Sequence, residues 1–511
     1  MNKENTAKEL TKVSTHKGKE NITKRINSRK RTDLVVAICG QLGSGTSTVS
    51  KEIKSIFESF NYTVYTVKLS KIIQEERSVT TKGLSKLQRI KELQENGNYM
   101  RLNYSHSVLA EFAVKQVHTY RAGADTDRDI DDERFVVLID SIKHPEEYDL
   151  LNLVYGNSFF QIGVLCPENQ RKQRLIVNAD ATPEIATKLI EKDKKENKPH
   201  GQKTINALYQ SDFFLYNEKD NISNIRTKLN RFISLIMSDI TITPTVEEYA
   251  MFLAQGSALR SGCLSRQVGA AILDEHNEII ATGRNDVPKF GGGLYCENDL
   301  TNDNRCIHRY NSGCKNTEYK NAIKDEIIST ISDYIKTGLN IEEIADNLFK
   351  IDKIKNLTEF SRSIHAEMDA ITTAARTGNK SLKNAKLFCT TYPCHNCARH
   401  IVASGISTVY YIEPYEKSLA LKLHDDSIEF DAAYSYNGKK LKIIPFEGVS
   451  PKKYIDLFVA EDRKKKQKEP IDRTEVSPAI ANLKESVELY EKVVIDNMVD
   501  REIIPAPQKP K

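Results

Sequence analysis

The sequence predicts two α/β domains in one chain: a parallel sheet with helices on both faces, followed by an α/β/α domain. The length of 511 residues is too great for one core at about 150 residues per domain. From residue 34 to about residue 238, apolar runs of strand length alternate with helical segments, which is typical of a parallel sheet. After Pro244 the order changes to a helix, a hairpin and further helices.

The composition excludes a membrane protein. No apolar run approaches the ~18 residues that a membrane span needs, and the start, Met1–Asn5, lacks the apolar core of a signal peptide. An apolar fraction of 39% is ordinary for a globular chain. Nine cysteines in so long a chain do not resemble a disulfide framework, and some have metal-ligand spacing. We therefore expect no membrane association and a reducing, cytoplasmic location.

Positive charge is concentrated at the start of the chain. Residues 1–32 carry ten Lys or Arg and three Glu, which gives a net charge of +7. Because the whole chain has a net charge of +5, the remaining residues sum to about −2. They lack apolar periodicity, so we predict a disordered basic arm. A second basic run, Arg463–Lys468, opens residues 461–511, which we predict to be a basic linker and a C-terminal amphipathic helix. Such runs are often only solvated; the alternative is attraction of nucleic acid through its phosphates.

The first predicted domain, residues 33–240, opens with an apolar strand, Leu34–Cys39, that runs into the glycine-rich turn Gly40–Thr48 before a helix. Glycines let backbone N–H groups close around phosphates at a helix N-terminus. The phosphate-loop pattern is met except at Thr46, where a lysine is expected, so binding is retained and phosphoryl transfer is disfavoured. The alternative is a turn without a ligand. The predicted nucleotide-binding residues are Gly40, Gly43, Ser44, Gly45, Thr46, Ser47 and Thr48, with an NTP as the expected ligand.

More of this domain fits the same interpretation. An apolar strand ends at Asp140, as a Walker-B strand does, so Asp140 is a further predicted nucleotide-binding residue. A later helix carries Arg171 and Arg174. The segment from residue 34 to about 238 resembles the nucleoside-monophosphate-kinase branch of the P-loop NTPase folds. In that resemblance the two arginines stand where such kinases place lid arginines. Because the lysine is missing, we predict a nucleotide-binding or regulatory domain.

The second predicted domain, residues 244–460, begins with a helix, Val246–Leu259, followed by a hairpin that reaches Asn285. Leu441–Phe446 is expected to be the last strand of its sheet. A polar, helical insertion at about residues 315–360 precedes the next helix. The insertion could frame a substrate entrance, mediate assembly or be neutral, and the sequence does not decide between these roles.

One histidine and two cysteines form the predicted metal site. His365, Cys394 and Cys397 offer one imidazole and two thiolates, a set that suits a tetrahedral zinc ion with its fourth position open to water. Zinc lowers the pKa of such a water toward roughly 7. Glu367 follows the histidine by two residues and is placed to carry a proton. The alternative, a closed zinc knuckle, lacks a fourth ligand and leaves Glu367 unexplained.

The order H-x-E followed by P-C-x-x-C is the signature of zinc nucleobase deaminases. Three segments, Arg260–Pro288, His365–Gly378 and Phe388–Tyr411, resemble deoxycytidylate deaminases. The resemblance implies the cytidine-deaminase fold and a nucleotide contact from Asn285, which alone would be a turn residue. The further expected substrate-binding residues are Ala366, Thr390 and Thr391.

Some members of that family bind a second, structural zinc ion. The resemblance implies Cys263 and Cys296 as two of its ligands, and Cys306, His308 and Cys314 are the candidates for the others. Free thiols are the alternative, because spacing alone does not bring the five together.

The whole chain, over roughly residues 34–460, resembles the bacterial anti-phage dCTP deaminases. This implies hydrolysis of free dCTP and dCMP to uracil nucleotides, depletion of cytosine deoxynucleotides as an antiviral defence, and inhibition by a small non-coding RNA, which the basic arms would meet. A helix is expected over residues 478–497, with its apolar side packed on the body of the protein or on another subunit. We also expect a homo-oligomer.

Three other functions remain open. A housekeeping dCMP deaminase would use the same site but would not need the first two hundred residues. An editor of RNA or single-stranded DNA would carry stacking aromatics and a basic groove around its pocket, whereas the basic runs here lie at the ends. A nucleotide kinase whose deaminase half only binds a regulator is disfavoured by Thr46.

Overall fold

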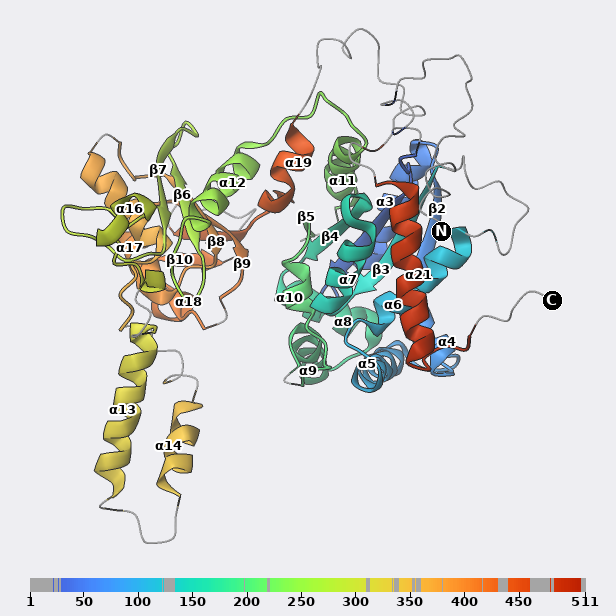
Figure 1. Cartoon of the computed structure of the whole chain (residues 1–511), viewed down its shortest axis with the longest axis horizontal. Helices are drawn as coiled ribbons and strands as arrows, with labels where there is room; N and C mark the ends of the chain where they lie inside the picture. Colours follow the sequence, from blue (N-terminus) through green and yellow to red (C-terminus); the bar gives the residue numbers. More distant parts are fainter. Residues whose placement is uncertain are drawn as a thin grey trace, which may run out of the picture.

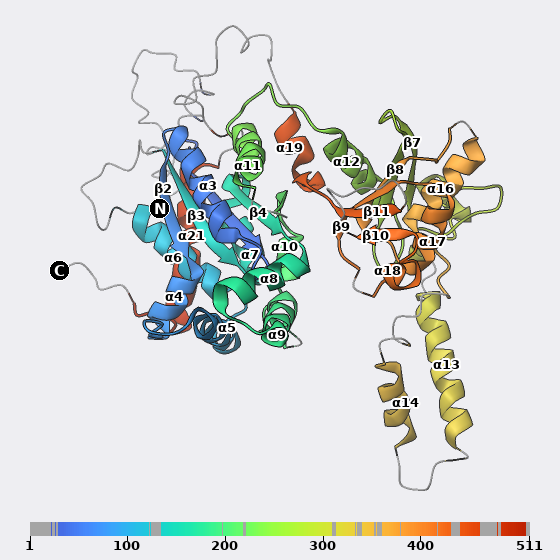
Figure 2. The same cartoon turned by 180° about the vertical axis from the view of Figure 1, so that it is seen from behind.

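Two mixed α/β halves, each built on a six-stranded sheet, make up the chain (Figures 1 and 2). The computed structural model describes residues 29–121, 134–196, 198–217, 221–308, 313–332, 340–351, 360–378, 380–415, 417–430, 440–459 and 482–506, and residues 22, 26, 123, 334, 354 and 478. Most of the predicted basic arm, 1–32, and the run Arg463–Lys468 lie outside the described residues. The α/β class with two sheets rich in parallel pairs is confirmed.

The first sheet has the strand order β12-β5-β4-β1-β3-β2. Its five parallel strands are β1 (Leu34–Gly40), β2 (Thr63–Lys68), β3 (Phe135–Ile142), β4 (Phe159–Leu165) and β5 (Phe213–Tyr216). The carboxyl ends of these strands meet at one edge. That edge carries the glycine-rich turn after β1, as the sequence predicts.

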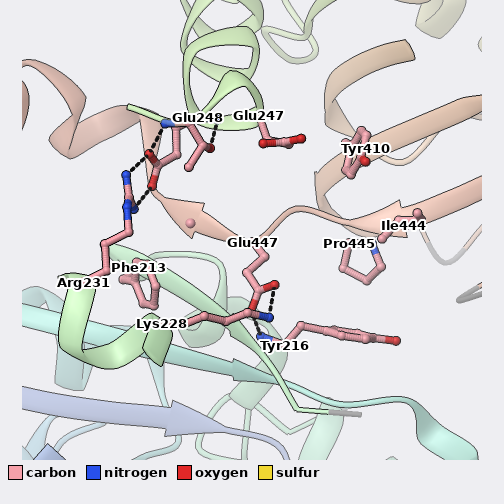
Figure 3. Close-up of a pocket in the computed structure, with 12 residues that line it drawn as sticks. Phe213, Tyr216, Lys228, Arg231, Glu247, Glu248, Tyr410, Ile444, Pro445 and Glu447 are labelled. Atoms are coloured by element: carbon pink, nitrogen blue, oxygen red, sulfur yellow. Dashed lines mark hydrogen bonds and ion pairs between the residues drawn. The ribbon is translucent and has the colours of Figure 1, made fainter. Parts of the chain in front are cut away.

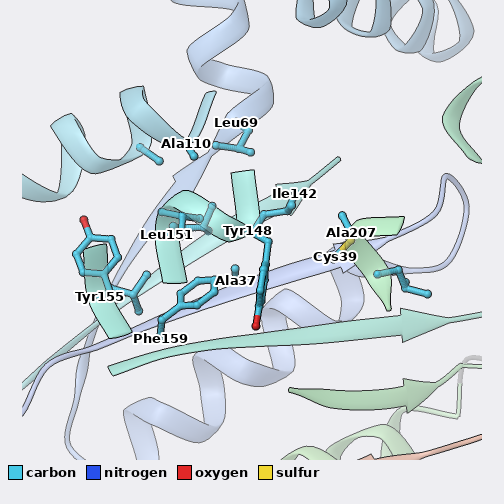
Figure 4. Packing of buried hydrophobic residues seen from close by; sticks show 14 of the residues in the cluster. Ala37, Cys39, Leu69, Ala110, Ile142, Tyr148, Leu151, Tyr155, Phe159 and Ala207 are labelled. Atoms are coloured by element: carbon cyan, nitrogen blue, oxygen red, sulfur yellow. The ribbon is translucent and has the colours of Figure 1, made fainter. Parts of the chain in front are cut away.

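Helices cover both faces of this sheet. Alternate residues of β1 point to opposite faces, so Val35 and Ala37 belong to one buried cluster and Val36 and Ile38 to another. Figure 4 shows the first cluster, in which Tyr148 and Phe159 pack with ring centroids 5.5 Å apart. The helices of this half, of which α8 and α9 pack on each other in a separate cluster, are α3 (Thr46–Ser59), α4 (Leu69–Glu76), α5 (Lys86–Asn103), α6 (Val108–Arg121), α7 (Pro145–Tyr155), α8 (Glu168–Ala179), α9 (Pro183–Lys194), α10 (Thr204–Leu208) and α11 (Ile222–Ile236).

The C-terminal part of the chain returns to the first half. Strand β12 (Gly448–Val449) pairs antiparallel with β5, and helix α21 (Lys484–Asp500) packs on α6. On α21 the buried Glu491 accepts hydrogen bonds from Arg121 and lies 3.2 Å from Nδ1 of His118. Of the two places expected for the C-terminal helix, the structure shows the body of the same chain.

The second sheet has the order β10-β11-β9-β8-β6-β7, with β6 antiparallel to both of its neighbours. Helix α12 (Val246–Ala258) packs on one face, and α16 (Ala366–Thr377) and α17 (His395–Ala403) pack on the other. Strand β11 is the last strand of this sheet along the chain, as the sequence predicts for Leu441–Phe446, and it lies between β9 and β10 within the sheet. The strands are β6 (Gly269–Leu273), β7 (Ile279–Arg284), β8 (Lys386–Thr391), β9 (Thr408–Glu413), β10 (Ile428–Phe430) and β11 (Leu441–Pro445).

The insertion forms a helical pair that projects from the second half (Figures 1 and 2). Helix α13 (Lys315–Ser332) packs against α14 (Ile341–Phe349), near the helical segments that the sequence predicts. At its base Tyr319 stacks on Phe360, with ring centroids 5.6 Å apart.

The two halves meet around two glutamates, as Figure 3 shows. Glu248 of α12 is fully buried and accepts hydrogen bonds from the guanidinium of Arg231 and from the N–H of Val449. Glu447 accepts hydrogen bonds from Lys228 Nζ and the N–H of Tyr216. Strand β12 belongs to the first sheet although it follows directly after β11 of the second sheet. The predicted domain boundary at residue 460 stays a prediction. No helix in the described part of the chain is long and apolar enough to cross a membrane.

Candidate metal and active site

Two helix N-termini bring the His365 group together. His365 is the N-cap residue of α16, and Cys394 is the N-cap residue of α17, which follows β8. His365 Nδ1 lies 3.3 Å from the sulfur of Cys394 and 3.3 Å from the sulfur of Cys397. All three ligand atoms lie within 4.8 Å of one another.

This donor set fits a zinc ion. With bond lengths near 2.3 Å to sulfur and 2.0–2.1 Å to nitrogen, tetrahedral ligands stand about 3.5 Å apart, close to the observed 3.3 Å. The soft thiolates and the imidazole are the donors that zinc prefers. The geometry supplies three ligands from the chain, in agreement with a site that keeps one position open.

Glu367 lies in the first turn of α16, and only 4% of it is exposed. It lines the same pocket as His365 and Cys394. Burial raises the pKa of the Glu367 carboxyl, and the nearby Cys394 adds to the effect. The hydrogen bond from Cys397, followed by contact with His365, lowers the pKa of Cys394 to about 4. The site thus pairs a thiolate donor with a carboxyl group that holds its proton readily.

Gly283 of β7 allows α16 to pack very close to the sheet. A Cβ atom there would lie 2.2 Å from the carbonyl oxygen of Ala366 and 2.4 Å from the nitrogen of Ala370. No side chain fits that gap. Gly283, two residues before Asn285, therefore fixes the position of the helix that carries Glu367 and is capped by His365.

A pocket of about 230 Å³ opens beside the cluster. Asn285, Ala366 and Thr391 line it, as expected of substrate-binding residues. The side chain of Asn285 also holds the wall in place, because its Oδ1 accepts the N–H of Val268 and its Nδ2 donates to the carbonyl of Arg266, both at 2.7 Å. Thr390 does not line the pocket.

The Thr390 hydroxyl is buried and accepts the N–H of Gly269 at 3.1 Å, which links β8 to β6. Its contact is therefore with the sheet, and a contact with substrate stays a prediction.

Several polar residues of the pocket were not predicted from the sequence. Arg266 forms an ion pair with Glu413, and burial lowers the pKa of its guanidinium. Ser361 and Ser363 could have been found from the sequence, because they lie just before His365. The other unpredicted polar residues come from segments farther away in the chain and are Ser265, Arg266, Asn316 and Tyr415.

The five candidates for a second zinc site do not form a metal-binding group among the described residues. His308 instead lies with its Nε2 3.2 Å from a carboxylate oxygen of Asp303. Cys314 lies 3.9 Å from the hydroxyl of Ser265 at the edge of the main pocket. Cys263 lines that pocket and also lines a second one together with Cys296, and Cys306 is buried. A second zinc ion at these residues stays a prediction.

The predicted phosphate loop lies between β1 and α3 at the carboxyl edge of the first sheet, with Asp140 near the end of β3. Gly43 and Gly45 have φ values of 82° and 91°. The loop that runs from Gly40 to Thr46 thus has the local form that the sequence predicts, and Ser47 and Thr48 lie in the first turn of α3.

The second half of the chain is similar in sequence to a known protein family. The family model of the cytidine and deoxycytidylate deaminase zinc-binding region matches residues 244–413. That range contains the His365, Cys394 and Cys397 cluster, so the match and the donor chemistry agree on zinc as the metal.

The similar sequences include two phage enzymes and a yeast enzyme. The deoxycytidylate deaminase of Enterobacteria phage T4 is 31% identical over 181 residues, which is 34% of this chain and 79% of the phage protein. That of phage T2 is 30% identical over 179 residues, 34% of this chain and 81% of that protein. The deoxycytidylate deaminase of Saccharomyces cerevisiae is 29% identical and matches 34% of this chain and 39% of the yeast protein.

The similar solved structures superpose weakly. The dCMP deaminase of cyanophage S-TIM5 in complex with dCMP and dUMP is 17% identical, with a TM-score of 0.23 over 40% of this chain and 99% of that one. The shikimate kinase of Acinetobacter baumannii is 10% identical, with a TM-score of 0.24 over 41% of this chain and 95% of that one. On the sequence match to the phage enzymes, which spans most of their length, the chain belongs to the cytidine and deoxycytidylate deaminase family.

Proposed function

We propose that the chain hydrolyses the amino group of free deoxycytidine nucleotides, dCTP and dCMP, to give dUTP or dUMP and ammonia with the help of Zn²⁺. One observation carries the proposal. Two members of a His-Cys-Cys cluster with zinc spacing, His365 and Cys394, and the buried Glu367 line one pocket of about 230 Å³. A metal-assisted hydrolysis needs these two components side by side.

Glu367 is the proton carrier in this proposal. Zn²⁺, when bound, supplies the Lewis acidity that makes water a nucleophile near neutral pH. Glu367 accepts a proton from the attacking water and delivers it to N3 as the oxygen adds to C4 of the ring. It then takes the hydroxyl proton and passes it to the amino group, which leaves as ammonia while C4 becomes a carbonyl. Two protons are taken from water and two are delivered, so Glu367 ends as it began.

The remaining pocket residues orient the nucleotide. Asn285 and the backbone of Ala366 hold the base beside the cluster, and Thr391 closes the wall. The polar rim contains Arg266, a cation suited to the phosphate of a nucleotide. A nucleotide phosphate would share this guanidinium with the carboxylate of Glu413.

A dCMP deaminase of nucleotide biosynthesis is the second candidate. The phage and yeast relatives are named deoxycytidylate deaminases, which favours dCMP as a substrate. Incubation of the purified protein with dCTP, dCDP, dCMP and cytidine, followed by measurement of ammonia and uracil products, separates the two. Turnover of dCMP with none of dCTP would leave only the second candidate.

The proposed biological role is defence against phage through loss of cytosine deoxynucleotides, with a small non-coding RNA as inhibitor and a homo-oligomer as the working form. Expression in a phage-sensitive bacterium should lower the plating of phage and the dCTP pool together. Equal plating with the wild-type protein and a catalytically dead variant would remove this role without affecting the proposed reaction.

The test of the catalytic assignment is Glu367→Ala. We expect bound zinc to stay at the wild-type level while turnover falls roughly a thousandfold or more, because proton transfer is lost. Glu275→Ala, at an exposed position in the hairpin of the same half, is the matched control. Wild-type turnover in the Glu367 variant would eliminate the assignment.

A further inference from the structure

A lysine from elsewhere in the chain contacts the glycine-rich loop Gly40–Thr48 of the first half. Thr46 occupies the usual lysine position, but Lys143, just after β3, reaches the loop. Its Nζ donates to the carbonyl of Gly40 at 2.8 Å and lies 2.8 Å from a carboxylate oxygen of Asp193. The chain therefore places an ammonium group at the beginning of the loop.

An internal carboxylate is bound to the same loop. Asp193, near the end of α9, is only 1% exposed, and its Oδ2 accepts the N–H of Leu42 at 2.8 Å. Its other oxygen contacts Lys143. A backbone N–H and a lysine are the two kinds of donor that a phosphate group receives in a loop of this type. Asp193 therefore stands as an anion where a phosphate oxygen would stand.

The loop is held by its carbonyl oxygens. Arg174 donates to the carbonyl of Gly43 and Asn217 donates to that of Ser44, each at 2.8 Å. Because the N–H and C=O of a trans peptide point in opposite directions, the N–H of Gly45 is directed away from Asn217. In the first turn of α3, the N–H groups of Thr48 and Val49 donate to the carbonyl of Gly45, whereas the first two N–H groups have no carbonyl to reach within their own helix. Together these features keep the loop open toward an anion.

Three buried polar groups at the loop lack a hydrogen-bond partner in the described part of the chain. They are Nε2 of Gln41, the hydroxyl of Ser44 and Nη1 of Arg171, and the last two residues are only 1% and 3% exposed. The Ser44 hydroxyl points into the turn, since a Cβ atom on Gly40 would lie 2.5 Å from it. Arg171 packs its backbone on Gly43 and has Asp193 as a charged neighbour. Leaving such groups unpaired costs about 1–3 kcal/mol each, so a ligand that pairs with them gains that free energy.

We propose that this loop is a binding site for a polyphosphate group, such as the end of a nucleotide, in which Lys143 replaces the missing lysine and Asp193 fills the site until the ligand displaces it. The site is separate from the deaminase pocket. Binding frees Asp193 and gives Ser44 and Arg171 their partners. The carboxylate competes with the ligand, so removal of its charge strengthens binding.

The experiment is calorimetric titration of the purified full chain with inorganic tripolyphosphate. Asp193→Asn should bind about tenfold more tightly than wild type, and Lys143→Gln at least about tenfold more weakly, the size expected for one charge-assisted contact. Glu191→Gln and Lys188→Gln, at exposed positions of the same helix α9, remove the same charges and should stay within about twofold of wild type.

Two results would overturn the proposal. In the first, each variant binds tripolyphosphate with the same affinity as its control: Asp193→Asn as Glu191→Gln, and Lys143→Gln as Lys188→Gln. The other is binding that is lost in Arg266→Gln and kept in Lys143→Gln, which would locate the tripolyphosphate in the deaminase pocket.

A measurement on wild-type protein covers the case in which a variant does not fold. Amide hydrogen exchange in Pro183–Lys194 should become faster when tripolyphosphate is added, because Asp193 is released. Exchange in this helix that is unchanged at saturating tripolyphosphate would also contradict the proposal.

Discussion

The two halves of the molecule both place polar groups near helix N-termini, but they satisfy those groups differently. At α16 and α17 the groups are electron-pair donors only, from His365, Cys394 and Cys397, so the arrangement requires a cation from outside the chain. At α3 the chain supplies both signs of charge itself, from Lys143 and Asp193.

This difference explains why one half is easier to interpret than the other. A set of donors without a counter-charge is stable only with its ion, so its chemistry follows from the donors. A loop that carries its own cation and anion is stable alone, and a ligand must compete with the chain. Affinity at such a site is reduced by the free energy of releasing the internal group.

The largest effect is expected when a ligand of the proposed zinc site is removed. Cys397→Ser replaces a thiolate with a poor zinc ligand, so bound zinc should fall below about 0.1 per chain and turnover by at least about a thousandfold. Elemental analysis and an ammonia assay measure both. Cys39→Ser, at a buried cysteine of the first half, should keep zinc and activity. Full zinc content in Cys397→Ser would mean that the cluster does not hold the metal.

The cluster could be predicted from the sequence because its members are close along the chain. His365 and Cys397 are separated by one helix, one strand and a helix turn. The spacing of Cys394 and Cys397 alone indicates that both bind one metal ion. Glu367 was found for the same reason. Asn285 was predicted from its motif, but not its second task of holding the Arg266–Val268 wall.

The groups of the first half could not be found in this way. Lys143 and Asp193 lie about one hundred and one hundred and fifty residues after the loop that they contact, and an isolated lysine or aspartate has no pattern. The return of β12 was hidden as well, because a two-residue strand carries no periodicity. The amphipathic pattern near residues 478–497 did predict a helix, while its partner α6 became known only from the structure.

A smaller effect sharpens the comparison within the first half. Asp212 is 1% exposed, accepts the N–H of Gln161 at 2.8 Å, and has no ion pair within 4.0 Å among the described residues, unlike Asp193. Burial raises the pKa of Asp212 to about 6. The folded protein therefore binds this proton more tightly than the unfolded chain, and the stability it contributes is lost as the pH rises from about 4 to about 6.

Asp212→Asn cannot ionise, so its free energy of unfolding relative to wild type should rise by up to about 3 kcal/mol between pH 4 and pH 7. Denaturant unfolding at several pH values measures the change. Asp193→Asn, which leaves Lys143 without its carboxylate, should instead be less stable than wild type at pH 7. A difference between Asp212→Asn and wild type that does not vary with pH would show that Asp212 keeps an ordinary pKa.

The smallest expected effects come from one glycine in each half and have opposite signs. Gly45 has φ +91°, and a Cβ atom there would lie 2.4 Å from Nδ2 of Asn217, so Gly45→Ala should lower the free energy of unfolding by about 2 kcal/mol. Gly256, inside α12, has open space around it, so Gly256→Ala should raise the free energy of unfolding by about 0.5–1 kcal/mol. Denaturant unfolding of both variants tests the pair. A Gly45→Ala protein as stable as wild type would mean that the loop does not need its left-handed turn, and the self-contained charge arrangement proposed there would lose its geometric basis.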